Sequence, residues 1–370
     1  MSRTCFACCA VSACPTGWNP RMVSRRSRRR SRMRRRQSRR LLEKRCRVAL
    51  EFERPILDLE TKIRDMRSYA EEQSMDLGEE IRLLEARLER LQAETFANLT
   101  RWQRVQVARA PGRPTGLDYI QHVFEGFEEL HGDRTLGDDP AVVTGLGQLD
   151  GRSLVVIAQQ KGRDTKENIH RNFGMSHPSG YRKAMRMFDL ADKFQLPVVT
   201  LIDTPGAYPG IAAEEQGQAW VIAASIQRMS RLRVPAVSIV IGEGGSGGAL
   251  AIGVANRVLI MENATYSVIS PESCAAILWR DAAEAPKAAE ALRLTAHDLR
   301  ELDIVDRVIP EPVGGAHRHP ESAMANVAAV LREELALLQA QTPDRWLEGR
   351  RERFRQLGRF AETSAGASPA

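Results

Sequence analysis

The sequence lacks a long hydrophobic run: nowhere do about 18 consecutive apolar residues occur, so a membrane-spanning helix is not expected. The N-terminus has no apolar stretch behind its positive charges, and we therefore expect no secretory signal peptide. Cysteine is also scarce, because five of the six lie in residues 1–46 and only Cys274 follows. A body with one cysteine is typical of a protein in a reducing cytoplasm.

Two short motifs are also missing. Structural zinc sites usually set two cysteine pairs about 12–20 residues apart. Here Cys5, Cys8, Cys9 and Cys14 are crowded together without such a loop, and we predict no metal site. No Gly-Lys-Ser/Thr sequence occurs, which excludes a phosphate-binding P-loop.

Positive charge is concentrated at one end of the chain. Residues 1–47 hold 16 Lys and Arg and one acid, a balance of +15. The remainder holds 38 basic and 46 acidic residues, a balance of −8, which argues against a nucleic-acid-binding body. We expect residues 1–46 to form a disordered extension with almost nothing to bury. It is either sequence upstream of the true start or a tail that binds RNA or another anionic surface.

Two amphipathic helices are expected in residues 52–100. Apolar residues recur every three or four positions within 56–66 and again within 81–91, which gives each helix one apolar face. Residues 76–78 interrupt the pattern. The sequence therefore predicts a helical hairpin, within residues 47–110, that packs on the body or on a partner subunit.

Residues 111–340 alternate short apolar strands with amphipathic helices, a pattern typical of an α/β fold. Residues 341–370 are expected to form a C-terminal helix and a loose tail. The expected strands are 142–144, 154–159, 198–202, 236–241 and 258–261, and the expected helices are 181–194, 213–229, 248–254 and 321–340.

Two glycine-rich segments each follow an expected strand. Residues 203–210 read Asp-Thr-Pro-Gly-Ala-Tyr-Pro-Gly, and residues 242–248 read Gly-Glu-Gly-Gly-Ser-Gly-Gly. Where a strand passes into a helix, the first backbone N–H groups have no intrahelical partner and stabilise an anion. Glycine lets a ligand approach that backbone closely. The segments predict two anion sites near one another.

The second segment also fits two unrelated motifs. Residues 242–247 match the GxGxxG pattern of nicotinamide-dependent oxidoreductases, with Glu262 at the expected distance. That motif normally opens the first strand–helix unit, whereas this one follows several strands. Residues 244–248 match the GxSxG nucleophile elbow, but no histidine stands in an obvious loop after a strand.

A basic segment follows the expected strand 154–159. Its side chains would suit the phosphates of a nucleotide-bearing thiol such as coenzyme A. A solvated charged loop explains the same composition. The basic residues are Lys161, Arg163, Lys166, Arg171, Arg182 and Lys183.

Long ordered strings carry a resemblance to a known family, the alpha subunits of acetyl-CoA carboxyltransferases. The likeness covers about residues 48–340, and Ser273 departs from the glycine expected beside a Ser-Pro-Glu run. The strings are 50–56 (Leu-Glu-Phe-Glu-Arg-Pro-Ile), 161–168 (Lys-Gly-Arg-Asp-Thr-Lys-Glu-Asn), 171–175, 180–184, 203–210, 241–253, 265–272 (Thr-Tyr-Ser-Val-Ile-Ser-Pro-Glu) and 309–318.

The resemblance implies a crotonase-like (ClpP/crotonase) α/β fold of repeated ββα units after the helical hairpin. It implies transfer of a carboxyl group from carboxybiotin to acetyl-CoA, forming malonyl-CoA for fatty acid biosynthesis. The implied partners are a carboxyltransferase beta subunit in an α2β2 assembly, a biotin carboxyl carrier protein that bears the biotin, and biotin carboxylase. A related propionyl-CoA carboxyltransferase stays open as an alternative.

This reaction places negative charge on an oxygen of each substrate. Preorganised N–H donors aimed at such oxygens each contribute about 3 kcal/mol. The donors are expected to be the backbone N–H groups of Gly206, Ala207, Gly247 and Gly248. Substrate binding is expected from Lys161, Arg163, Lys166, Arg171, Arg182, Tyr208, Gly210, Gly244, Gly245 and Ser246.

Overall fold

The computed structural model describes residues 50–73 and 75–358, which belong to one compact unit, Cys46–Ala370. The predictions for residues 1–46 and for the tail after 358 lie outside the described residues. The division into segments 47–110, 111–340 and 341–370 stays a prediction. Within the described ranges, no helix is long and apolar enough to cross a bilayer.

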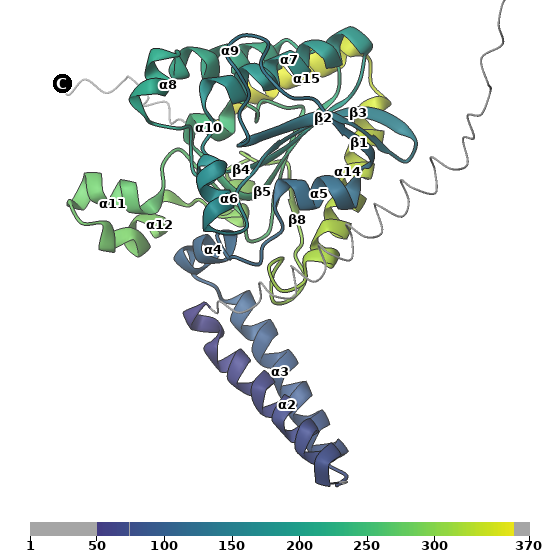
Figure 1. Ribbon diagram of the computed structural model, residues 1–370, viewed down its shortest axis with the longest axis vertical. Coiled ribbons are helices and arrows are strands. Elements are labelled where there is room, and N and C mark those ends of the chain that lie inside the picture. The colour runs from purple at the N-terminus through teal and green to yellow at the C-terminus, as the bar shows by residue number, and fades with distance from the viewer. Residues whose placement is uncertain (1–49, 74, 359–370) are drawn as a thin grey trace, which may run out of the picture. The chain divides into compact units, whose positions relative to one another are not determined.

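The predicted helical hairpin is present. After a short 3-10 turn, η1 (Glu51–Glu53), helices α2 (Arg54–Gln73) and α3 (Gly78–Ala97) lie side by side (Figure 1). Their contact buries Ile56 and Phe96, and the Gln92 amide donates to Glu60 Oε1 at 3.2 Å. The amphipathic repeat is therefore explained by packing of one helix on the other.

An eight-stranded sheet forms the body, in the order β1-β2-β3-β4-β5-β6-β8, with β7 paired to the end of β5. The first three strands are antiparallel, and the pairs from β3 to β8 are parallel. Two consecutive strands precede a helix at β2–β3 and at β6–β7. The strands are β1 (Glu125–Glu129), β2 (Val142–Leu149), β3 (Arg152–Gln159), β4 (Val198–Thr204), β5 (Ala236–Gly245), β6 (Arg257–Met261), β7 (Thr265–Ser267) and β8 (Arg307–Ile309).

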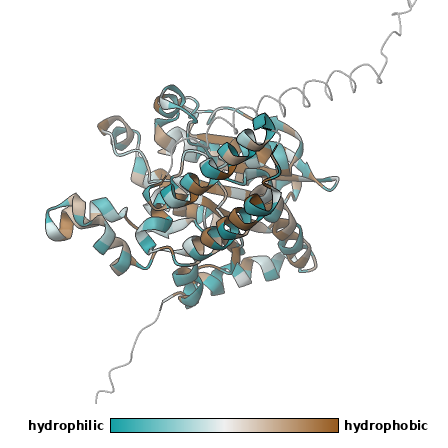
Figure 2. Cartoon of the chain, turned by 90° about the horizontal axis from the view of Figure 1, so that it is seen from below, coloured by the Kyte–Doolittle hydropathy of each residue, from teal (hydrophilic) through white to brown (hydrophobic). Residues whose placement is uncertain are grey.

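Helices cover both faces of the sheet (Figure 1): α7 and α9 lie on one face, and α5 and α14 lie on the other. The central strand β4 is buried along its whole length, as a strand covered on two faces must be, and the helices carry both hydrophobic and hydrophilic residues (Figure 2). The remaining helices are α4 (Arg101–Ala108), α5 (Gly116–Val123), α6 (Thr165–His170), η2 (Asn172–Gly174), α7 (Pro178–Phe194), α8 (Ile211–Glu215), α9 (Gln218–Ser230), α10 (Ser246–Leu250), α11 (Pro271–Trp279), η3 (Ala282–Glu284), α12 (Ala285–Leu292), α13 (Ala296–Glu301), α14 (Pro320–Gln339) and α15 (Pro343–Gln356).

Three expected elements differ from the structure. The helix expected over 248–254 is the shorter helix α10, which ends at Leu250. The helix expected over 213–229 is two helices, α8 and α9, because Gly217 between them adopts a φ of +78° that breaks the helix. The second glycine-rich segment is mostly strand, since β5 continues through Gly245 and α10 begins at Ser246. The turn is therefore much tighter than the loop expected over 242–248.

Helix α15 is fixed to the body by a buried arginine. The Arg350 guanidinium donates to the carbonyl oxygens of Met229, Leu232 and Val234 at 2.8–3.0 Å. It is fully buried, and burial lowers its pKa to about 10. These bonds join the C-terminal helix to the edge of the sheet where the parallel strands begin.

Candidate functional site

The two glycine-rich segments meet at one edge of the sheet. Strands β4 and β5 are parallel neighbours, with Val198 opposite Ala236 and Thr204 opposite Gly244. Their carboxyl ends therefore lie together, where ligands of open α/β sheets are usually bound. The predicted proximity of residues 203–210 and 242–248 is thus observed.

The backbones of the two segments touch. A Cβ added to Gly248 would lie 2.5 Å from the Ala207 nitrogen and 2.6 Å from the Gly206 carbonyl carbon. A Cβ on Gly245 would overlap the Pro205 carbonyl. Gly247 differs, because a Cβ there would meet only the Ile222 side chain, at 3.5 Å. Gly245 and Gly248 are therefore required for packing, and Gly247 is not.

The turn between β5 and α10 holds a strained residue. Ser246 is exposed and has a φ of +53°, a conformation that non-glycine residues rarely adopt. Such strain persists only where the surrounding structure enforces it, and it clusters at functional sites. Here it turns the chain from strand to helix within one residue, so the N–H groups of the next residues belong to the first turn of α10 and have no intrahelical partner.

Hydrogen bonds within the chain distinguish the four expected donors from one another. The Gly206 N–H donates to Thr204 Oγ1 at 3.1 Å, so that donor is already engaged. Ser176 pairs with Ala207, and it is the Tyr208 N–H that donates to Ser176 O at 3.0 Å. Between the described residues, no hydrogen bond engages the N–H of Ala207, Gly247 or Gly248. Three donors on two touching segments are thus left for a ligand.

Buried polar side chains support the two glycine-rich segments through hydrogen bonds to their carbonyl oxygens. Gln159 Nε2 donates to the Gly248 carbonyl at 2.8 Å, and the Tyr181 hydroxyl lies 3.4 Å from the same oxygen. Gln218 Nε2 donates to the carbonyls of Ser176 and Tyr208 at 2.8 and 3.0 Å. No local sequence pattern marks these residues, because each contacts a segment far away along the chain.

The aromatic ring of Tyr208, in the first glycine-rich segment, packs against a second ring. Its ring lies 4.2 Å, centroid to centroid, from the ring of His177. A Cβ on Gly210 would overlap the Tyr208 ring, so glycine at this position lets the ring fold back over its own loop. The structure therefore brings Tyr208 and Gly210 together and adds His177, which the sequence did not single out.

A charged cluster includes one carboxylate from each of the two segments. Lys161 Nζ, after β3, lies 2.8 Å from Asp203 Oδ1 and 2.6 Å from Glu243 Oε2. Arg109, directly after α4, donates from Nε to Glu243 Oε1 at 2.5 Å, and its guanidinium also pairs with Glu272 of α11. Burial alone would raise the pKa of Glu243, but the two cations outweigh it and lower that pKa to about 2.

The basic residues expected to bind phosphate are largely engaged within the chain. Arg163 pairs with Asp118 at 2.5 Å, Arg171 donates to the Pro140 carbonyl at 2.7 Å, and Arg182 donates to the Gln216 carbonyl at 2.5 Å. Lys166 is exposed on α6, and no ion pair among the described residues involves it. Of this set, Lys166 is the most accessible cation.

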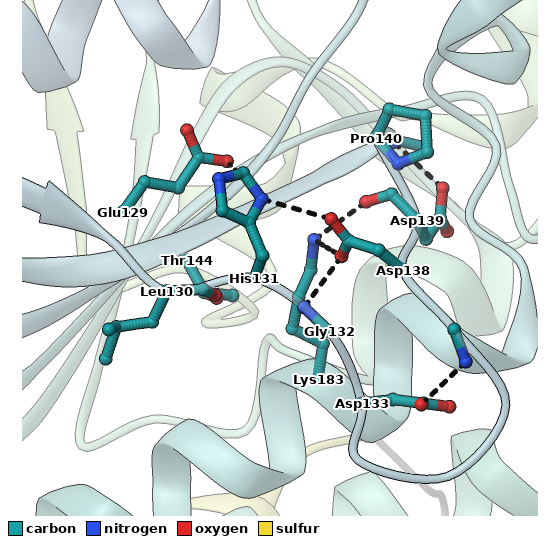
Figure 3. Close-up of polar contacts among 12 residues, drawn as sticks. Glu129, Leu130, His131, Gly132, Asp133, Asp138, Asp139, Pro140, Thr144 and Lys183 are labelled. Carbon is teal, nitrogen blue, oxygen red and sulfur yellow. Dashed lines mark hydrogen bonds and ion pairs between the residues drawn. The ribbon is translucent and has the colours of Figure 1, made fainter.

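Lys183 belongs to a separate cluster (Figure 3). Its ammonium is buried and donates to Asp138 Oδ1 at 2.5 Å and to the Asp139 carbonyl at 2.8 Å. Burial alone would raise the pKa of Asp138, but Lys183 holds it well below its ordinary value. His131 lies 3.1 Å from the same carboxylate. This network ties the segment between β1 and β2 to α7, and Lys183 is not available for phosphate.

The two rival motifs do not fit the observed geometry. The first two glycines of GxGxxG lie inside β5 rather than in a loop, and Glu262 accepts a hydrogen bond from the Glu311 N–H at 3.0 Å. Ser246 has the backbone of a nucleophile elbow, but within the described ranges no hydrogen bond joins its hydroxyl to a histidine. The geometry therefore supports neither nicotinamide binding nor a serine triad.

The site offers little enclosed space. A hollow lined by Arg109, Pro205, Gly244, Gly245 and Ser267 measures about 20 Å³, room for roughly one water molecule. In residues 50–73 and 75–358, no group of three or more His, Cys, Asp or Glu is placed to hold a metal ion. Beside the two segments, the described residues therefore enclose only this small hollow.

Comparison with known proteins gives consistent matches. Residues 49–358 match the family described as acetyl co-enzyme A carboxylase carboxyltransferase-like. The acetyl-coenzyme A carboxylase carboxyl transferase subunit alpha of Thermus thermophilus is 64% identical over 313 residues, 85% of this chain and 99% of that protein. The corresponding subunit of Deinococcus radiodurans is 58% identical over 305 residues, 82% of this chain and 96% of that protein.

Solved structures share the fold at low sequence identity. A transcarboxylase 12S structure with methylmalonyl-coenzyme A bound matches with a TM-score of 0.51 and 20% identity, over 69% of this chain and 44% of that chain. A Pseudomonas malonate decarboxylase hetero-tetramer in complex with coenzyme A matches with a TM-score of 0.51 and 20% identity, over 64% and 92% of the two chains. Together with the mostly parallel sheet, these likenesses confirm the expected crotonase-like α/β fold.

Proposed function

The chain belongs to the family of acetyl-CoA carboxylase carboxyltransferase alpha subunits, and from this premise we propose how it acts. It is the half of a carboxyltransferase that receives carboxybiotin from a biotin carboxyl carrier protein. A beta subunit completes the site, in an α2β2 assembly, and brings most of the acetyl-CoA contacts. The product is malonyl-CoA, and the enzyme works in the cytoplasm together with biotin carboxylase.

The observation that carries this proposal is the set of unengaged N–H groups on the touching segments. The donors of Ala207, Gly247 and Gly248 belong to the two segments where Gly245 and Gly248 pack on residues 205–207. Because a side chain at Gly245 or Gly248 would overlap that backbone, the donors are held rigidly before a ligand arrives. Rigid donors stabilise a developing oxyanion without reorganising during the reaction.

The residues would act by electrostatics rather than by covalent chemistry. Carboxybiotin, when bound, supplies the carboxyl group and leaves charge on its ureido oxygen. The Gly247 and Gly248 N–H groups, on one segment, and the Ala207 N–H, on the other, would face that oxygen or the enolate oxygen of acetyl-CoA. Gly206 would act indirectly, since its N–H bond to Thr204 fixes the shape of the first segment. No protein base is required, because the biotin nitrogen can accept the methyl proton.

Substrate-binding roles are proposed for the residues around the donors. Tyr208 and Gly210 would flank the biotin ring, and Ser246 and Gly244 would shape the turn against it. Lys166, as the exposed cation, would meet an anionic group of a substrate or of the carrier protein. Lys161, Arg163, Arg171 and Arg182 would support the loops through the internal contacts described above. Propionyl-CoA in place of acetyl-CoA is the alternative substrate.

We expect the purified chain to be inactive by itself and active when co-purified with its beta partner. The hollow beside Gly244 and Gly245 is too small to enclose an acyl thioester, so a second surface must complete the site. Malonyl-CoA formation from carboxybiotin and acetyl-CoA would be measured for the chain alone and for the complex. Turnover by the chain alone at the rate of the complex would contradict the proposal.

The segment 1–46 is expected to be dispensable. The family match begins at residue 49, and every contact of the site described above lies after residue 100. Deleting 1–46 should leave the melting temperature and the turnover of the complex unchanged. A large loss of either would assign the segment a role in folding or assembly, and RNA affinity that survives the deletion would contradict the charge argument.

A further inference from the structure

Three neighbouring parallel strands carry charged residues at or just beyond their carboxyl ends, within or beside the two glycine-rich segments. Lys161 follows β3, Asp203 is in β4 two residues before Pro205, and Glu243 is in β5 three residues before Ser246. The side chains are largely buried, at 19%, 9% and 12% exposure. Two carboxylates brought together in such a place repel each other unless a cation lies between them.

Lys161 is that cation. Its ammonium contacts both carboxylates, at 2.8 and 2.6 Å, and its aliphatic part packs against Gly174, where a Cβ would lie 2.8 Å from Lys161 Cγ. The Glu243 N–H also donates to Asp203 Oδ1 at 3.0 Å, which ties the two strand ends directly. The two strand ends are therefore joined both by this bond and by the shared ammonium group.

The other charged groups that face this cluster are Arg109, directly after α4, and Glu272 of α11. Arg109 pairs with Glu243 and with Glu272, and the side chains of Arg109 and Glu272 are each about one-third exposed. Arg113 is the remaining cation near Asp203, and its guanidinium is committed to Glu311. Lys161 is therefore the only one of these cations that contacts both Asp203 and Glu243.

We propose that Lys161 is a positioning residue for carboxyl transfer: by neutralising Asp203 and Glu243 together, it sets the separation of the two segments that carry the oxyanion donors. This role differs from contact with a phosphate group of the substrate. It rests on the proposed function for the identity of the reaction, although the geometry of the cluster stands independently.

The lysine influences the protonation of its neighbours in a way that can be measured. Burial alone would raise the pKa of Glu243, but Lys161 and Arg109 hold it at about 2, so the carboxylate stays charged at any pH where the enzyme works. Without Lys161 the pKa of Glu243 rises, because burial of this carboxyl group and the negative charge of Asp203 both favour the neutral acid. Protonation would then relieve the repulsion, so activity should recover toward acidic pH.

The experiment compares Lys161→Met, Glu243→Gln and the double variant, each in complex with the beta partner. Lys193→Met, an exposed lysine at the end of α7, is the matched control and should behave as wild type. For Lys161→Met we expect turnover to fall about 100-fold, the typical result of a 1 Å misplacement, with the KM for acetyl-CoA little changed. The double variant should recover most of that loss, since Asp203 would then face a neutral amide in place of a second carboxylate.

The pH profile is the second readout. The ratio of Lys161→Met turnover to wild-type turnover should rise as pH falls from 8 to 6, whereas the control ratio stays flat. A raised KM with unchanged kcat would show that Lys161 touches substrate and would overturn the proposal. The proposal would also be overturned if the double variant lost as much turnover as the two single variants combined.

The melting temperatures of wild type, the two single variants and the double variant form a second double-mutant cycle. This measurement does not depend on the reaction. If the unaltered complex formed no malonyl-CoA, the proposed function would fail. Non-additive melting temperatures would still support the charge-balanced cluster, and strictly additive ones would overturn it.

Discussion

Replacing Gly247 by valine is expected to reduce malonyl-CoA formation by the assembled enzyme by about 10²–10³, the usual cost of losing one oxyanion donor. A Cβ at Gly247 meets only the Ile222 side chain, in ordinary van der Waals contact, so the melting temperature should change little. The valine methyl groups would crowd the N–H groups at the start of α10, which are unengaged within the described chain.

Gly248→Ala is the contrasting variant. Its Cβ would overlap the backbone at Gly206 and Ala207, so the two segments must separate and stability should fall together with turnover. Melting temperature, assembly with the beta partner and malonyl-CoA formation would be measured on the same preparations. If the activity of Gly247→Val fell only in proportion to its folded and assembled fraction, Gly247 would be a packing glycine and its oxyanion role would be wrong.

Replacing Arg113 by methionine is expected to lower the free energy of unfolding by about 3–5 kcal/mol, the cost of leaving a buried partner charge alone. Arg113 donates to both Glu311 oxygens, at 3.1 and 2.6 Å, and its Nε donates to the Ile241 carbonyl at 2.7 Å. Both ionic side chains are at most 4% exposed. The melting temperature should fall by on the order of 10 °C.

Arg228→Met is the matched control for this loss. Arg228 pairs with Asp189 at 3.1 Å, but both side chains are about half exposed, so removal should cost at most about 1 kcal/mol. Equal losses from Arg113→Met and Arg228→Met would contradict the claim that burial makes the first pair costly to break.

The same pair predicts a pH dependence. Burial would raise the pKa of Glu311, but Arg113 outweighs it and lowers the pKa below the ordinary glutamate value. A lowered folded-state pKa contributes stability above the unfolded-state pKa, and that contribution is lost as pH falls through the folded value. Acid unfolding of wild type should therefore be steeper than that of a Glu311→Gln, Arg113→Met double variant, as followed by circular dichroism across pH 2–6.

Elements with strong local signals were predicted from the sequence. The 3.6-residue apolar repeat predicted α2 and α3, and apolar runs predicted the central strands β3, β4, β5 and β6 to within three or four residues at most ends. The glycine-rich segments were correctly placed near one another, because parallel strands bring their carboxyl ends to one edge. These features depend on residues close together in the chain.

Features that depend on distant contacts were not predicted. Arg109 reaches Glu243 and Glu272, 134 and 163 residues away, and no local pattern marks it. Lys161 and Arg163 read as free cations in the sequence, yet carboxylates from other elements neutralise both of them. The strand end at Gly245 was misplaced because glycine usually interrupts strands, whereas here pairing with β7 extends β5.

We propose that this chain, with its beta partner, moves a carboxyl group from biotin to acetyl-CoA across the two touching glycine-rich segments. The most direct measurement follows a carbon-labelled carboxyl group on carboxybiotin after mixing with the purified complex and acetyl-CoA. We predict that the label appears in malonyl-CoA with wild type, and that its rate of appearance is about 10²–10³-fold lower with Gly247→Val. Label that never enters the thioester with wild type, or that enters equally fast with both proteins, would contradict the account.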